Sequence, residues 1–505
     1  MEEENKALLS ERNRYRSSFS ATVLFSGVQI YQILIRIIKS KFIALLIGPA
    51  GMGIASLLRS TTDTVSAATN MGLNTSSVKT IAAASREGNN ILIAKNVIAQ
   101  RRLIWITGLV GMIICAAFAA VWSQVSFGDN SYVWSFVIVS SVVLFDQLNK
   151  GELALLQGMQ QRKKLARANV LGQTLNAIIT IPLFYFWGIN AIVASLVLGS
   201  LISLLISLSF SRRLELGIIG LSWKETFSIG REMINLGFFL SLQSLLSLII
   251  VWIIRNYVSK EGGLDEVGLY SAGTTIITSY IGLVFTAIAT DYFPRLAATK
   301  NNEEMESAVR TQAELTILLL TPLVVAFLVY IKPIIILLYS TKFLPIEYMM
   351  YWSVGGVLIQ AIAWALSHTL LAKAKPSLFF MNELIAALWS LPIRILCYKW
   401  WGLTGFGIAT VLVYIVYLLQ IIVVTKKIFK ISYEKSVWRL FAFLNLIIFG
   451  AVLIKLTLPV IWGYIGGSLI FLMVGLYVFV KLDKKMDLKT IIASKVIKNN
   501  GIFSN

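Results

Sequence analysis

Side chains that bind metal ions or form disulfides are scarce in this sequence. It contains only two cysteines, Cys115 and Cys397, and one histidine, His368, among its 505 residues. Both cysteines lie inside apolar runs, and the histidine has no cysteine or second histidine near it. A disulfide framework needs several paired cysteines, and a zinc site needs clustered cysteine and histidine ligands. We therefore expect neither a metal site nor a disulfide-stabilised fold.

Charged residues are also few, and basic ones outnumber acidic ones. Only 14% of the residues are charged, with 45 Lys and Arg against 25 Asp and Glu, whereas 57% are hydrophobic. The mean hydropathy of +0.76 is typical of a membrane protein. In such a protein the net charge of +20 indicates basic cytoplasmic loops rather than nucleic-acid binding. No nucleic-acid partner is expected.

Motifs for nucleotide binding and hydrolysis are missing as well. The sequence has no GxxxxGK[ST] phosphate-binding loop, so ATP is not the expected energy source. It shows no serine-hydrolase or zinc-enzyme motif, which argues against an enzyme. The hydrophilic start, MEEENKALLSERNRYR, lacks the basic and apolar regions of a signal peptide, so we expect the first apolar segment to be retained.

Long apolar segments follow one another along nearly the whole chain. A bilayer-spanning helix needs ~20 mostly apolar residues, and the sequence predicts about fourteen such helices. The most polar of them, at 50–80, is expected to face a bundle interior. Lysines and arginines concentrate in the alternate loops 160–167, 211–232 and 426–439, which predicts cytoplasmic N- and C-termini. The expected fold class is an all-α polytopic membrane protein.

A weak internal repeat relates the two halves of the chain. The matched positions keep one order, at offsets of roughly 213–219 residues: Arg36 with Arg255, Gly53 with Gly268, Asn169 with Asn382, and Gly188 with Gly402. Such a pattern is typical of a duplicated six-helix unit with both copies in the same orientation. It predicts a six-helix lobe at 1–210, a cytoplasmic linker at 211–231, a second six-helix lobe at 232–425, and two extra transmembrane helices with a basic cytoplasmic tail at 426–505. In the linker, LGIIGLSWKETFSI is expected to form a short amphipathic helix on the membrane surface.

Charged residues inside the predicted spans are the candidate functional residues, because each costs about 2.5–3.5 kcal/mol at the bilayer centre. Arg59 and Asp63 lie four residues apart, which places them on one helix face within pairing distance. Asp146 and Lys150 repeat this spacing on a later span. Each pair either lines a polar cavity or forms a purely structural contact, and the sequence leaves both interpretations open.

The arginines near the ends of spans are open to two interpretations. Arg36 and Arg255 either extend to the outer headgroups, as Lys39 and Lys41 are expected to do beside Arg36, or face a space shared by the two halves. Arg394 lies one turn from the outer end of its span. We predict a substrate-binding set of Arg36, Arg59, Lys150, Arg255, Arg394 and Asn382. We predict a set for ion coupling or charge balance of Asp63, Asp146 and Glu383.

The segment IGPAGMGIASLLRS at 47–60, the two six-helix halves and the final hairpin resemble Wzx-type polysaccharide flippases. These O-antigen and enterobacterial common antigen translocases belong to the multidrug/oligosaccharidyl-lipid/polysaccharide exporter superfamily. The resemblance implies a MATE-like transporter with two pseudo-symmetric lobes. It implies alternating access through a cationic central cavity, which would flip undecaprenyl-pyrophosphate-linked oligosaccharide to the periplasmic leaflet of a bacterial inner membrane for lipopolysaccharide assembly.

The same resemblance implies no cofactor, with a proton or sodium gradient as the candidate energy source. It makes membrane lipid, the glycan polymerase and the chain-length machinery the candidate partners. Two alternatives stay open. An ion-coupled multidrug exporter on the same fold would need a cavity dominated by acidic residues. A membrane glycan polymerase or ligase would need extended or acidic outer loops, and the predicted ones are short.

Overall fold

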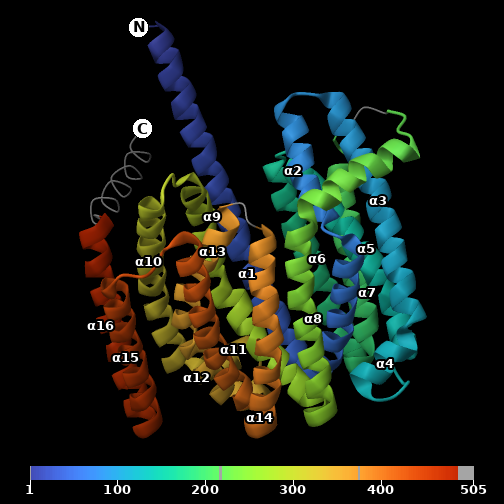
Figure 1. Ribbon diagram of the computed structural model, residues 1–505. Coiled ribbons are helices and arrows are strands. Elements are labelled where there is room, and N and C mark those ends of the chain that lie inside the picture. Colours follow the sequence, from blue (N-terminus) through green and yellow to red (C-terminus); the bar gives the residue numbers. More distant parts are fainter. Residues whose placement is uncertain (1, 215–218, 374–375, 487–505) are drawn as a thin grey trace, which may run out of the picture. The chain divides into compact units, whose positions relative to one another are not determined.

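The computed structural model describes residues 2–214, 219–373 and 376–486, and nearly all of these residues lie in helices (Figure 1). The described part of the chain contains no strand, so the predicted all-α class is confirmed. The first nine elements are α1 (Glu2–Asn70), α2 (Leu73–Arg86), α3 (Asn90–Ala117), α4 (Ala119–Phe127), α5 (Val133–Gly158), α6 (Arg162–Trp187), η1 (Gly188–Ala191), α7 (Ile192–Ser211) and α8 (Trp223–Thr275). The others are η2 (Ile276–Ile281), α9 (Gly282–Ala298), α10 (Asn302–Val329), α11 (Ile331–Leu338), η3 (Thr341–Ile346), α12 (Glu347–Gly355), α13 (Val357–Ala372), α14 (Pro376–Phe429), α15 (Lys435–Thr457) and α16 (Val460–Met486).

The chain forms two compact units. The first consists of Met1–Ser271 with Leu338–Lys342, and the second of Ala272–Leu337 with Phe343–Asn505. The division between them falls near the end of α8, whereas the predicted seam between the two repeats is the linker at 211–231. The boundaries predicted for the two six-helix lobes, 1–210 and 232–425, therefore stay a prediction.

Among the described residues, eight helical segments are long and apolar enough to cross a membrane, or nine if the bent pair α12 and α13, with η3, counts as one span. Four of them are 40 residues or longer, about twice the length that one crossing needs: Tyr31–Asn70, Arg162–Ser211, Ser241–Thr286 and Ser377–Phe429. The protein is therefore a multi-pass membrane protein. Because four of the segments are long enough for two crossings each, the predicted number of about fourteen spans is consistent with these helices.

A glycine with positive φ interrupts each of these four long segments. Gly48 (φ 64°, ψ −170°) breaks α1, and Gly263 (φ 79°, ψ −178°) breaks α8 at the position 215 residues later. Gly188 (φ 54°, ψ −132°) and Gly402 (φ 56°, ψ −141°) form a second pair, 214 residues apart. Only glycine adopts such backbone angles without strain. The repeat found in the sequence thus has a counterpart in the backbone conformation.

Two further repeat-related glycines bring α1 and α8 into backbone contact within the first unit. A Cβ atom at Gly53 would lie 2.0 Å from the carbonyl oxygen of Leu264, and one at Gly268 would lie 1.9 Å from that of Pro49. No side chain fits at either position, because both neighbours are main-chain atoms. The segment of α1 that follows Gly48 is therefore fixed against the segment of α8 that follows Gly263.

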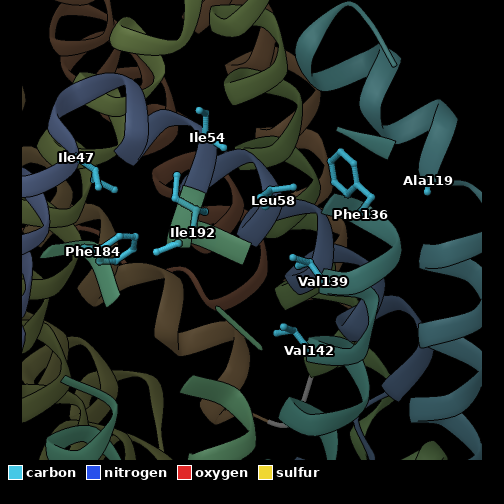
Figure 2. Close-up of a cluster of buried hydrophobic side chains, with 10 residues drawn as sticks. Ile47, Ile54, Leu58, Ala119, Phe136, Val139, Val142, Phe184 and Ile192 are labelled. Atoms are coloured by element: carbon cyan, nitrogen blue, oxygen red, sulfur yellow. The ribbon is translucent and has the colours of Figure 1, made fainter. Parts of the chain in front are cut away.

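The core of the first unit holds the same part of α1 against α4 to α7. Figure 2 shows these buried apolar side chains, which converge from several helices: Ile47, Ile54, Leu58, Ala119, Phe136, Val139, Val142, Phe184 and Ile192. Burying each large apolar side chain contributes roughly 1.5–3 kcal/mol in water, and close packing supplies the equivalent attraction in a membrane. This packing places the polar residues of α1 opposite those of α5 and α6.

The first turn of α8 carries a capping box. The main-chain N–H of Glu225 donates to Ser222 Oγ at 3.2 Å, and the N–H of Ser222 donates to Glu225 Oε2 at 3.0 Å. These bonds hold the pKa of the exposed Glu225 carboxyl below its usual value. The amphipathic helix predicted at 216–229 begins only at Trp223 and continues into α8, while 216–218 lie outside the described residues.

Candidate functional site

An arginine held by two carboxylates forms the centre of the candidate site. Arg59 Nε donates to Asp63 Oδ2 at 3.1 Å, and Arg59 Nη2 lies 3.1 Å from Asp63 Oδ1 and 2.6 Å from Asp146 Oδ2. Asp63 follows Arg59 by one turn of α1, whereas Asp146 comes from α5. The Asp146 side chain is only 12% exposed, so its negative charge depends on this arginine. The structure thus joins the predicted Arg59–Asp63 pair to Asp146, which the sequence had paired with Lys150.

Arg59 lines a cavity of about 420 Å³ whose other lining residues come from α1, α5, α6 and α7. Its charged lining consists of Lys39, Arg59, Asp146 and Lys150. Amides and hydroxyls complete its polar surface: Asn149, Asn176, Thr180, Ser195, Ser200 and Ser203. Three cations therefore face one carboxylate, and that carboxylate is already bound to Arg59.

A second cavity, also of about 420 Å³, is lined by α1, α2, α5 and α8. Arg59 and Lys150 line it as well, so their side chains lie where the two cavities meet. Asp63 is its acidic residue, and its remaining polar lining is Ser66, Asn70, Asn74, Thr75, Ser241 and Ser244. Both cavities combine an excess of positive charge with neutral hydrogen-bonding groups. Both lie within the first unit.

Lys39 belongs to this site, although the sequence interpretation placed it with Lys41 among the outer headgroups. That expectation was wrong, because Lys39 lines the first cavity and its Nζ donates to Asn176 Oδ1 on α6. A signal was present in the sequence, since Asn176 and Thr180 lie one turn apart on a mainly apolar helix.

The two arginines matched by the repeat have different surroundings. Arg36 is exposed on α1 and lines neither cavity. Arg255 is half-buried, and its Nη1 donates to the carbonyl oxygen of Ser56 at 3.2 Å. Its Nε has no hydrogen-bond partner among the described residues. Arg255 therefore contacts the α1 backbone one turn before Arg59, and a substrate role for either arginine remains a prediction.

Asn382 and Glu383, two of the predicted residues of the second unit, belong to a separate hydrogen-bonded network within α14. Tyr417 OH donates to Glu383 Oε1, and Gln420 Nε2 donates to the Asn382 carbonyl oxygen at 2.8 Å and to its Oδ1 at 2.9 Å. Trp389 Nε1 donates to Gln420 Oε1 at 2.7 Å. The break at Gly402 lets the two arms of α14 face each other and form these bonds.

Two other charged residues, the predicted Arg394 and Glu152, lie outside these networks. Arg394 is half-buried on α14 and forms no salt bridge with a described residue. Glu152, near Lys150 on α5, lines neither cavity and instead forms a bidentate pair with Arg101 of α3, at 2.9 and 2.8 Å. This pair joins the two helices and has a structural role. Within residues 2–214, 219–373 and 376–486 there is no group of three or more metal-binding side chains.

Sequence comparisons place this geometry in a family context. The model of a family described as "Polysaccharide biosynthesis protein" matches residues 42–347, which is more than half of the chain. A putative O-antigen transporter from Shigella flexneri is 29% identical over 148 residues, covering 29% of this chain and 34% of that protein. The aligned region thus spans about a third of the relative's length.

Structural comparisons identify the fold. A multidrug resistance MATE family transporter of the MOP superfamily, in an inward-facing conformation, is 15% identical, with a TM-score of 0.63 over 83% of this chain and 98% of its own. The lipid II flippase MurJ, in an inward closed conformation, is 13% identical, with a TM-score of 0.65 over 93% of this chain and 99% of its own. The predicted MATE-like fold is therefore confirmed.

Proposed function

The chain belongs to the polysaccharide biosynthesis protein family, and from this premise we propose that it is a flippase for lipid-linked oligosaccharide. In this proposal it is a transporter and not an enzyme. It moves undecaprenyl-pyrophosphate-linked glycan from the cytoplasmic to the periplasmic leaflet of a bacterial inner membrane, with both termini in the cytoplasm. Glycan polymerase and chain-length proteins then receive the product.

The observation that carries the proposal is the position of Arg59 and Lys150 between two polar cavities. A pyrophosphate crosses hydrocarbon only if its charges are paired, because an isolated buried charge costs many kcal/mol. Guanidinium and ammonium groups supply charge-assisted hydrogen bonds to phosphate oxygens. The hydroxyls and amides around both cavities suit the hydroxyl groups of a sugar. The lipid tail can stay in the membrane throughout.

The two carboxylates on Arg59 give the site a moderate affinity. Asp63 and Asp146 already satisfy its guanidinium, so an incoming phosphate competes with them for hydrogen bonds. A substrate held too tightly would not leave, and this competition favours release during alternating access. In the same proposal Asp63, Asp146 or Glu383 also carries the coupling proton or sodium ion.

The fold likeness to a multidrug transporter makes a drug exporter the second candidate. Cations outnumber carboxylates in the lining of both cavities, which disfavours a cationic drug and favours an anionic cargo.

Both candidates can be tested with the purified full-length chain in liposomes. A fluorescent undecaprenyl-pyrophosphate oligosaccharide is placed in both leaflets, and a membrane-impermeant reductant quenches only the outer pool. We expect the protein to make the inner pool accessible, whereas uptake of a lipophilic cationic dye stays at the level of empty liposomes. Transport of the dye without movement of the glycolipid would contradict the proposal.

A further inference from the structure

The first cavity carries more positive charge than its surroundings neutralise. Lys39, Arg59 and Lys150 face it, and the carboxylate in its lining, Asp146, is bound to Arg59 at 2.6 Å. Lys150 forms no salt bridge with a described residue. Two ammonium groups therefore share a cavity without a carboxylate of their own.

The surroundings of Lys39 supply a dipole but no charge. Its Nζ donates to Asn176 Oδ1, and the same oxygen accepts a hydrogen bond from Thr180 Oγ1 at 3.1 Å. Gly199 on α7 leaves space for this amide, since a Cβ atom there would lie 2.5 Å from Asn176 Nδ2. Asn176 is thus held in position by two helices and directs its carbonyl oxygen at the ammonium.

An ammonium in the membrane interior is normally paired with a negative charge, because an uncompensated one is costly. The hydroxyls of Ser195, Ser200 and Ser203 do not provide that charge, and each donates to a carbonyl oxygen of its own helix. A negative ligand in the cavity would accept charge-assisted hydrogen bonds from the ammonium groups there.

We propose that this cavity is a binding site for a small inorganic anion, of the halide or phosphate class, held by Lys39 and Lys150. Asn176 is the positioning residue that keeps Lys39 directed into the cavity. The volume of about 420 Å³ lies near the low end of the roughly 300–1,000 Å³ of ligand pockets, which leaves ample room for a hydrated small anion. The proposed anion site does not depend on which substrate the protein transports.

The test uses the full-length protein in lipid nanodiscs and bromide as the probe. The thermal unfolding midpoint is measured against bromide concentration at constant ionic strength, with the much larger anion gluconate as the balancing salt. We expect a saturable rise in the wild type and in Lys39→Arg, and loss of the response in Lys39→Met. Lys79→Met on the exposed face of α2 is the matched control and retains the response. Inorganic phosphate in place of bromide shows which class binds more tightly.

Asn176→Asp provides a second and sharper variant, because it places a carboxylate beside Lys39. The internal carboxylate should replace the bound anion, so the apparent Kd for bromide rises about tenfold or more while the protein stays as stable as the wild type. A wild type without a saturable response, or equal responses in wild type, Lys39→Met and Asn176→Asp, overturns the proposal. No glycolipid enters these measurements, so a failed flipping assay alongside intact bromide binding would reject only the proposed function.

Discussion

Arg59 Nη2 on α1 lies 2.6 Å from Asp146 Oδ2 on α5, and this ion pair joins two helices at the boundary of the two cavities. Asp63 holds the same guanidinium from the next turn of α1. The pair therefore has two roles that can be separated by mutation: it stabilises the first unit, and it presents a cation to a ligand.

Removing the arginine alone should affect both roles. Arg59→Gln leaves the buried Asp146 carboxylate unpaired, which we expect to lower the free energy of unfolding by about 1–3 kcal/mol. Flipping should fall about tenfold or more, the equivalent of one lost charge-assisted hydrogen bond. The double variant Arg59→Gln/Asp146→Asn should recover most of the stability but not the transport. Recovery of flipping in the double variant would show that Arg59 is purely structural.

The repeat-related glycines should tolerate no side chain. Gly53→Ala and Gly268→Ala each place a Cβ atom about 2 Å from a carbonyl oxygen, so α1 and α8 must separate. We expect a loss of about 1–3 kcal/mol or more in unfolding free energy, measured in detergent. Gly450→Ala and Gly475→Ala on the final helices are controls, because a Cβ atom there meets nothing within 4 Å. Equal stability of all four variants would refute the close backbone contact.

The bidentate pair between Arg101 and Glu152 should matter for stability and not for transport. Glu152→Gln removes a buried carboxylate that accepts two hydrogen bonds from α3, so the thermal unfolding midpoint should fall. The flipping rate per folded molecule should stay within about twofold of the wild type, because the residue lines neither cavity. A selective loss of transport would move Glu152 into the functional site.

The network of α14 is the candidate for ion coupling in the second unit. Glu383→Gln keeps the shape of the side chain and its contact with Tyr417 but removes the titratable group. We expect flipping to lose its response to an imposed proton or sodium gradient, while movement down the substrate gradient continues. Trp389→Phe, which removes only the bond to Gln420, should keep the gradient response. An unchanged gradient response in Glu383→Gln would exclude that residue from coupling.

The spacing of charged residues along the sequence was sufficient to predict part of the candidate site. The separation of Arg59 and Asp63 by four residues predicts their pairing, because helical geometry alone brings them together. The repeat in turn identified Gly53 and Gly268, which the fold places in contact. The long apolar segments were likewise enough to predict an all-α membrane fold.

Side-chain contacts between different helices could not be predicted from spacing within the sequence. Asp146 binds Arg59 only because α5 packs on α1 in one register, and no pattern within either helix encodes that register. Lys39 and Arg36 have similar positions near the outer end of one span, so hydropathy alone does not distinguish a headgroup position from a cavity position for either residue. Packing of α6 turns Lys39 toward Asn176 and leaves Arg36 exposed.

The most direct test of the account is the flipping rate of Lys150 variants in liposomes with the fluorescent undecaprenyl-pyrophosphate oligosaccharide. Lys150 lines both cavities and has no carboxylate partner among the described residues, so its substitution changes the charge presented to a ligand without breaking an ion pair within that part of the chain. We expect Lys150→Gln to flip the glycolipid at least about tenfold more slowly than the wild type, and Lys150→Arg to stay close to the wild-type rate. Wild-type rates in both Lys150→Gln and Arg59→Gln would contradict it.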